Sequence, residues 1–163
     1  MNEKADRTEL EALIVEIEDQ ERRLVFTRFT NDDAWELGSL LVRLGRERSL
    51  TVTIDIRRNG HQLFHAALAG TAPGNDSWIN RKVNVVNRFG ESSFLVGRRL
   101  ELYGVTLDEG AGVAPIDYAA HGGSFPISIV DVGVVGSVTV SGLPQVADHA
   151  LVVEAITEFL GVA

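Results

Sequence analysis

The segment from Trp78 to Arg99 concentrates the side chains best suited to binding chemistry. Its five basic residues are Arg81, Lys82, Arg88, Arg98 and Arg99. Its only acidic residue is Glu91, so five positive charges and one negative charge leave a local net charge of +4, whereas the whole chain has a formal net charge of −8. Positive charge concentrated in an acidic protein needs anionic partners. These partners are the protein's own carboxylates, a second subunit or an acidic small ligand.

The ligand interpretation places an anion pocket near the start of a helix. Arg81 or Lys82 would hold the anion, and Trp78 would form an apolar wall. The planar fork of arginine donates two parallel hydrogen bonds to a carboxylate or phosphate. Haem propionates, a small dicarboxylate or a phosphate would all suit such a pocket. The alternative is that the basic residues form ion pairs within or between subunits.

A glycine-rich turn supplies the second group of candidate residues. His121, Gly122 and Gly123 directly precede a predicted strand. The glycines would let the backbone approach a ligand, with their N–H groups forming an anion nest, or they would only permit a tight turn. Of the other histidines, His65 is a candidate iron ligand or a hydrogen-bonded core residue, and His149 is expected at a surface or interface.

Composition and missing motifs exclude several functional classes. The chain has no cysteine, which rules out disulfides and thiolate metal sites. It lacks a nucleophile elbow, a phosphate-binding loop and a zinc-ligand spacing, so we expect no metal site, and the catalytic residues, if any, stay unknown. The acidic net charge argues against nucleic acid as a partner. Without a signal peptide or apolar span, we expect one cytoplasmic domain over residues 1–163 that does not contact membranes.

The first half of the chain predicts two helices and three strands. Apolar spacing indicates a helix over 8–20, and a short strand follows over 24–29. Asn31 is expected to cap a second helix that ends near Arg48. The Asn59-Gly60 pair predicts a hairpin between strands at 51–58 and 61–68. A two-residue loop would pair Ile54 with His65 and place His65 in the apolar row of the first strand.

The second half predicts three helices and two strands. Asn75 and Asp76 should cap a basic helix that ends at Gly90, and Ser92 or Ser93 should start another that ends at Gly104. Strands are expected over 125–130 and 134–141, and Pro144 should open a final helix that is apolar almost all round. Its predicted apolar stripe comprises Val146, Ala150, Val153 and Ile156, which would be sandwiched in the domain or lie in a subunit interface.

The predicted order of elements gives an α+β fold. Five strands with two hairpins favour a mostly antiparallel sheet, and the intervening helices would cover both faces in an α/β/α sandwich.

Three stretches resemble a known family. They are RNGHQLFHAALAGTAPGNDSWINRKVNVVNRFGESS at 58–93, HGGSFPISI at 121–129 and GVVGSVTVSGLPQVADHALVVEAI at 133–156. Together they resemble the haem-degrading domain family, the GlcG/HbpS-like group, in its branch of unknown function. The resemblance covers about residues 8 to 160. It implies a profilin-like sandwich, homo-oligomers and haem as a candidate cofactor. The family's GG-x-PI motif has one extra residue here, in Gly122-Gly123-Ser124-Phe125-Pro126-Ile127.

Two functions are compatible with these observations. The first is an oligomeric protein that binds haem or a small anionic metabolite. Its proposed ligand-binding residues are Trp78, Arg81, Lys82, His121, Gly122 and Gly123. The second is an oligomeric interaction or scaffold protein without catalytic activity, in which the basic residues are interfacial ion pairs.

Overall fold

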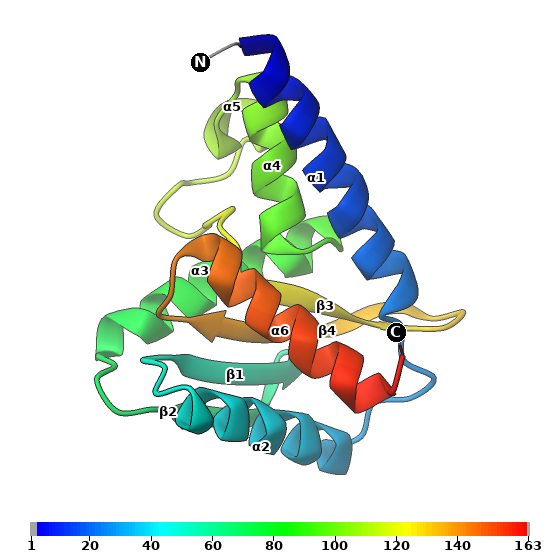
Figure 1. The fold of residues 1–163 in the computed structure, drawn as a ribbon, viewed down its shortest axis with the longest axis vertical. Coiled ribbons are helices and arrows are strands. Elements are labelled where there is room, and N and C mark those ends of the chain that lie inside the picture. The colour runs from blue at the N-terminus through cyan, green and yellow to red at the C-terminus, as the bar shows by residue number, and fades with distance from the viewer. Residues whose placement is uncertain (1–2, 163) are drawn as a thin grey trace.

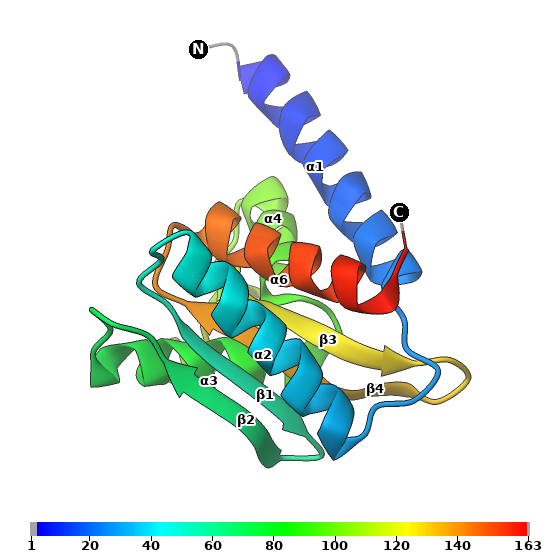
Figure 2. The same ribbon diagram turned by 60° about the horizontal axis from the view of Figure 1, so that its bottom comes forward.

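The computed structural model describes residues 3–162. Its elements in chain order are α1 (Glu3–Arg23), α2 (Asn31–Glu47), β1 (Thr53–Arg58), β2 (His61–Ala67), α3 (Pro73–Phe89), α4 (Ser93–Tyr103), α5 (Leu107–Ala111), β3 (Ser124–Ile129), β4 (Gly133–Ser141) and α6 (Gln145–Leu160). The strands form one antiparallel sheet in the order β2-β1-β4-β3. Helices α2 and α6 cover one face of this sheet and α3 lies on the other, while α1 packs beside α4 and extends away from the sheet (Figures 1 and 2). The predicted α+β class, with helices on both faces, is confirmed.

The described residues contain four strands rather than the predicted five. Residues 24–29 form a single parallel bridge between Phe26 and Ile129. Phe26 donates to the Ser128 carbonyl at 2.8 Å, and its own carbonyl accepts from Val130 N at 2.9 Å. Leu24, Phe26 and Phe29 are all buried, so the apolar pattern reflects anchoring in the core rather than a strand.

The predicted hairpin is present, but its register differs. Asn59 and Gly60 have φ of 51° and 77°, as a type I′ turn requires. A bulge after Ile56 shifts the pairing, so that His65 lies opposite Asp55 and Ile54 lies opposite Ala66. The expectation that His65 joins the apolar row is therefore wrong. The exposed His65 instead contacts the Asp76 carboxylate, with Nε2 2.7 Å from Oδ1.

Two predicted helix starts are also shifted. Thr30, rather than Asn31, caps α2, where its hydroxyl accepts from Asp33 N at 3.1 Å. Ala72 takes the N-cap position of α3, and the Asn75 side chain accepts from its N–H at 2.9 Å. The predicted ends at Gly90 and Gly104 are confirmed, since both glycines are left-handed C-caps.

The two faces of the sheet have different chemistry. The face under α2 and α6 is apolar and includes Ile54, Ile56, Val138 and Val140. The alternate positions, which point toward α3, are buried and polar. They include Thr53, Asp55, Ser137 and Thr139. The α3 side of the sheet therefore has a polar interior into which a charged side chain can extend.

Half of the predicted stripe of α6 is confirmed, since Ile156 is buried in the core and Val153 packs against it. Val146 and Ala150 are exposed, whereas Leu151, Val152 and Ala155 face the core. His149 is also buried rather than at the surface. Its ring lies 4.7 Å from the Phe94 ring, and its Nε2 lies 2.8 Å from Gln20 Oε1. Burial lowers the pKa of His149 from 6.5 to about 4.

Helix α2 packs closely on β2 at Gly38, and a larger residue there should destabilise the fold. A methyl group on Gly38 would overlap the Phe64 ring, whereas one on Gly74 in α3 would meet no atom within 4 Å. We expect Gly38→Ala to lower the free energy of unfolding by about 1–3 kcal/mol. Urea denaturation of Gly38→Ala and the control Gly74→Ala would measure this. Equal stability of the two variants would contradict the packing.

The buried His149 should make the fold sensitive to mild acid. The unfolded chain takes up a proton near pH 6.5, whereas the folded chain does so only near pH 4, so stability is lost as the pH falls through this window. The loss attributable to this group is about 3 kcal/mol. Urea midpoints measured from pH 7.5 to 5 should fall less steeply in His149→Gln than in wild type. The control His61→Gln, at an exposed hairpin position, should keep the wild-type slope.

Candidate functional site

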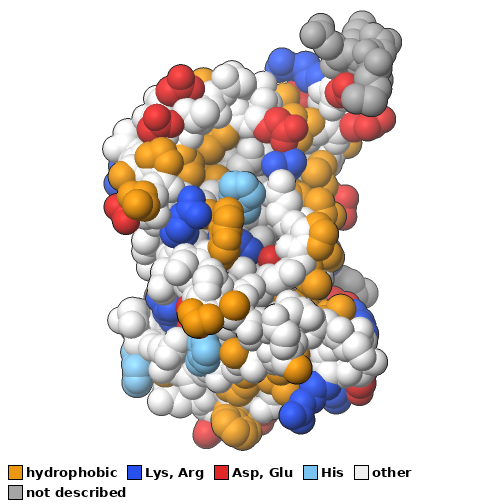
Figure 3. Space-filling model, turned by 90° about the vertical axis from the view of Figure 1, so that its left-hand side faces the viewer, with side chains coloured by type: hydrophobic (Ala, Val, Ile, Leu, Met, Phe, Trp, Pro, Cys, Tyr) orange, Lys and Arg blue, Asp and Glu red, His pale blue; other side chains and the backbone are white. Residues whose placement is uncertain are grey.

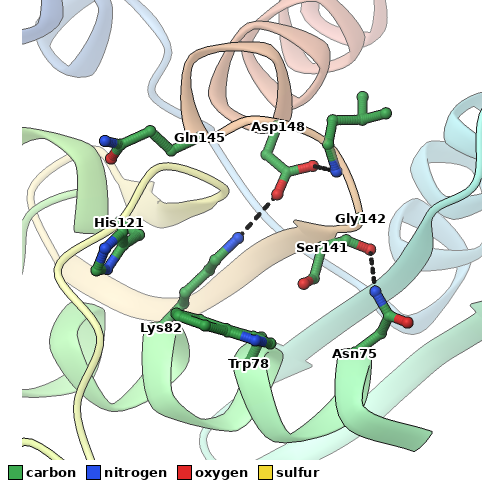
Figure 4. A pocket seen from close by; sticks show the side chains of 9 residues that line it. Asn75, Trp78, Lys82, His121, Ser141, Gly142, Gln145 and Asp148 are labelled. Carbon is green, nitrogen blue, oxygen red and sulfur yellow. Dashed lines mark hydrogen bonds and ion pairs between the residues drawn. The ribbon is translucent and has the colours of Figure 1, made fainter. Parts of the chain in front are cut away.

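A buried ion pair joins α3 to α6 at the end of β4. Lys82 Nζ lies 2.9 Å from Asp148 Oδ2 (Figure 4). It also donates to the Val140 carbonyl at 3.2 Å. Asp148 Oδ1 accepts from Leu143 N at 3.0 Å. Only 4% of the Lys82 side chain and 2% of the Asp148 side chain are exposed. Burial lowers the pKa of Lys82, and the Asp148 carboxylate opposes that shift by stabilising the ammonium group.

A cavity of about 300 Å³ lies over this ion pair. Its remaining walls come from the start of α3, the end of β4 and the start of α6 (Figure 4). The lining residues are Asn75, Trp78, Lys82, His121, Ser141, Gly142, Leu143, Gln145 and Asp148. The amide, hydroxyl and ammonium donors of this lining, together with the indole of Trp78, suit a small ligand that carries acceptor oxygens.

A larger cleft of about 630 Å³ adjoins the cavity. It runs between α4 and the segment 105–120, and it shares His121 and Gln145 with the cavity. Apolar side chains, among them Leu100, Val105 and Leu107, form much of its lining. On the face in Figure 3, a histidine, hydrophobic side chains and basic side chains lie next to one another in the middle of the molecule.

His121, Trp78 and Arg81 meet where the cavity joins the cleft. The rings of His121 and Trp78 are 5.4 Å apart, edge to face, and the Arg81 guanidinium lies 4.7 Å above the indole. Burial lowers the pKa of His121, and the nearby charges of Lys82, Arg81 and Arg98 lower it further. The imidazole is therefore neutral at pH 7 in a positive local potential.

Some of the basic residues form internal ion pairs, as one interpretation predicted, and others have no carboxylate partner, as ligand binding would require. Three of them pair with carboxylates: Lys82 with Asp148, Arg98 with Glu101 at 2.7 Å, and Arg99 with Glu91 and Glu18 at 2.6 and 2.8 Å. Arg81 donates to the Pro115 carbonyl at 2.8 Å, and Arg88 to the Ala111 carbonyl at 3.2 Å. Neither Arg81 nor Arg88 has a carboxylate within 4 Å among the described residues. Most of the local charge is thus neutralised internally, and Arg81 is the unpaired cation that reaches the cleft.

The structure brings only some of the predicted site residues together. Trp78, Lys82 and His121 line the cavity, and Arg81 lines the adjoining cleft. Gly122 and Gly123 are buried behind them. A methyl group on Gly122 would overlap the Gln145 carbonyl, and one on Gly123 would overlap the Val140 carbonyl and crowd Lys82 Nζ. These glycines let backbone and the Lys82 ammonium pack closely, which favours the structural interpretation of the turn.

Sequence reasoning missed Asp148, Gln145, Ser141 and Asn75. Asp148 stands 66 residues after Lys82, and an acid in the first turn of a helix is normally explained by the helix dipole. Asn75 was noticed, but only as a capping residue. Its amide also donates to the Ser141 carbonyl at 3.3 Å, which ties the start of α3 to the end of β4. The one signal in the sequence was Lys82 itself, because a lysine on the apolar face of a helix needs a carboxylate partner when it is buried.

The described residues contain neither a metal-binding cluster nor a membrane-spanning helix. Within residues 3–162, no three His, Asp or Glu side chains are close enough together to bind a metal ion. No described helix is both long enough and apolar enough to cross a membrane.

Comparison with known proteins identifies the family. A family model described as "Haem degrading protein HbpS-like" matches residues 29–157. The UPF0303 protein SCO2848 of Streptomyces coelicolor is 64% identical over 148 residues, which cover 91% of this chain and 94% of the relative. The crystal structure of the Ybr137w protein has 35% identity and a TM-score of 0.85, covering 91% of this chain and 87% of that one.

A more distant structure, a PduOC–haem complex, is similar in fold only. Its identity is 14% and its TM-score 0.67, covering 79% of this chain and 93% of that one. The family match and the close relatives confirm the resemblance seen in the sequence motifs. This chain belongs to the HbpS-like family of haem-degrading proteins.

Proposed function

We propose that this protein binds a small anionic ligand at the junction of the cavity and the cleft, between Arg81, Trp78 and His121. The observation that carries the proposal is the position of Arg81, which has no carboxylate partner among the described residues and lies over Trp78 beside His121, an imidazole that has no hydrogen-bond partner there. Partial desolvation and the nearby charges of Lys82, Arg81 and Arg98 lower the pKa of His121, which is solvent-accessible and lines both the cavity and the cleft. A negatively charged group there would gain the charge of Arg81, which no carboxylate neutralises.

The cavity beside this junction supports a ligand of modest size. Its volume of about 300 Å³ lies at the lower end of the usual range for small-molecule sites. The ion pair of Lys82 and Asp148 closes its floor and is itself neutral overall, so it provides hydrogen bonds rather than net charge. The amide of Gln145, whose Oε1 accepts from Gly122 N at 3.2 Å, presents its remaining donors at the same mouth.

Haem is the group that the family description implies, and the junction fits part of it. A neutral, accessible imidazole such as His121 can ligate iron, and Arg81 could receive one propionate. The cavity alone is small for a tetrapyrrole, so haem would have to occupy the adjoining cleft. When bound, haem would supply redox chemistry. His121 would ligate the iron and Arg81 would bind a propionate carboxylate.

A second candidate function is homo-oligomeric interaction without ligand binding. Trp35 on α2 is 67% exposed and packs edge-on against Phe64 of β2, with ring centroids 5.9 Å apart. Strand β2 lies at the edge of the sheet. An exposed tryptophan beside an open strand edge is typical of a subunit contact. Light scattering of wild type and Trp35→Glu would measure whether this surface holds subunits together.

Replacing Arg81 should weaken anion binding, whereas replacing Arg88 should not. Both arginines belong to α3 and donate to main-chain carbonyls of the same segment, but only Arg81 lines the cleft. Loss of a charged hydrogen bond costs about 1.5–3 kcal/mol, so we expect Arg81→Gln to weaken binding about 10-fold to 100-fold. Calorimetric titration with phosphate, acetate and citrate tests this. Titration with hemin, followed by the Soret band in wild type and His121→Gln, tests haem. Equal effects of Arg81→Gln and Arg88→Gln would refute the site.

Anion affinity at this site should rise as the pH falls. The pKa of His121 is lowered in the free protein, and a bound anion would raise it by stabilising the imidazolium. Binding is then coupled to proton uptake between these two pKa values, with affinity increasing up to about tenfold per pH unit. Titrations from pH 8 to pH 5 should show this dependence in wild type and lose it in His121→Gln. A pH-independent affinity in wild type would contradict the role of His121.

A further inference from the structure

The cleft beside the junction is larger than the cavity and differs from it in chemistry. It has about twice the volume, and its walls are formed by α4, by α5 and by the segment that leads to His121. Its apolar lining residues are Leu100, Val105, Leu107, Pro115, Ala119 and Ala120. Gly97 lies in its floor, where a methyl group would overlap the Ala120 carbonyl, so α4 and this segment are already in contact below the cleft. The cleft therefore offers an apolar trough that opens at the anion site.

Two charged residues of the cleft, Arg81 and Asp108, have no oppositely charged partner among the described residues. Arg98 forms an ion pair with Glu101 at 2.7 Å, and both line the cleft. The carboxylate of Asp108 accepts a hydrogen bond from the Thr106 hydroxyl, which lowers its pKa and keeps it negative. Arg81, in contrast, has only carbonyl partners among the described residues. Arg81 is thus the cation near His121 that is left to bind a ligand charge, while the unpaired Asp108 repels a second anionic group in the cleft.

We propose that the ligand is a monocarboxylic acid with an apolar body, whose carboxylate lies between Arg81 and His121 and whose apolar part occupies the cleft between α4 and α5. This inference rests on the proposed anion site and adds the class of ligand. The planar guanidinium of Arg81 matches a single carboxylate. The aliphatic walls exclude water from the body of the ligand, and burial of its methylene groups supplies most of the affinity. The unpaired carboxylate of Asp108 selects against diacids and polyphosphates.

A series of straight-chain acids tests the proposal on the full chain. Acetate, butanoate, hexanoate and octanoate would be titrated by calorimetry at pH 6.5. Each buried methylene should increase affinity roughly fourfold, so octanoate should bind far more tightly than acetate. Octanedioate should bind at least about tenfold more weakly than octanoate, because its second carboxylate would enter the apolar cleft near the unpaired Asp108.

Matched variants locate the apolar part. Val105 is exposed in the cleft wall, and Ile116 is 79% exposed on the same segment but outside the cleft. Val105→Asn should reduce the gain in affinity from acetate to octanoate, while Ile116→Asn should leave it unchanged. Arg81→Gln should weaken the binding of every acid by a similar factor. Circular dichroism and thermal unfolding would check that each variant is folded.

The outcomes separate this inference from the anion site itself. If acetate and octanoate bind equally and Arg81→Gln weakens both, the cleft is not a ligand site and the anion site stands. If octanoate binds tightly but Arg81→Gln has no effect, or if Ile116→Asn acts as Val105→Asn does, the proposed position of the ligand is wrong. If neither these acids nor phosphate bind, both the anion site and the apolar cleft are refuted.

Discussion

The buried pair of Lys82 and Asp148 is the interaction on which the site depends. Lys82 belongs to α3 on one face of the sheet, and Asp148 belongs to α6 on the other, so their contact ties the two helical layers together where β4 ends. Removing either partner would leave an uncompensated buried charge, which is far more costly than losing an exposed ion pair. Gly123 is required beside it, because any side chain there would crowd the ammonium group. The glycine turn, the helix starts and the cavity floor therefore all depend on the contact between Lys82 and Asp148.

The position of this ion pair follows from the different chemistry of the two faces of the sheet. The apolar face supplies the continuous core under α2 and α6, which is sufficient to define the fold. The α3 face carries buried hydroxyls and Asp55, so α3 is held partly by hydrogen bonds, such as that from Arg57 to Asn80 Oδ1 at 2.7 Å. Polar contacts have directional requirements that apolar packing lacks, so they fix how α3 lies over the sheet. The orientation of α3 in turn sets the positions of its side chains Trp78, Arg81 and Lys82.

Local patterns predicted most of the fold because its elements carry local signals. Asn59-Gly60, Gly90, Gly104 and the apolar spacings each depend on nearby residues alone. The predictions that were wrong concerned features that depend on residues far away in the sequence. The bulge after Ile56 moved His65 to the other face, and the apolar 24–29 segment anchored in the core instead of pairing along β3. In the site, Trp78, Lys82 and His121 were found by type and spacing. Asp148 was not found, because only the folded chain brings it to Lys82.

The positive charge at the junction can attract an anion only at short range. The chain is acidic overall, so its long-range potential repels an approaching anion, and most of the basic residues between Trp78 and Arg99 are neutralised by carboxylates. What remains is Arg81, whose guanidinium lies over the Trp78 ring, together with the His121 imidazole, whose pKa is lowered by burial and nearby positive charge. Contacts of this kind are partly shielded from solvent and are screened less by salt than exposed charges are. Selection of the proposed ligand would then depend on its fit to the junction and the cleft, because the acidic chain offers an anion no long-range attraction.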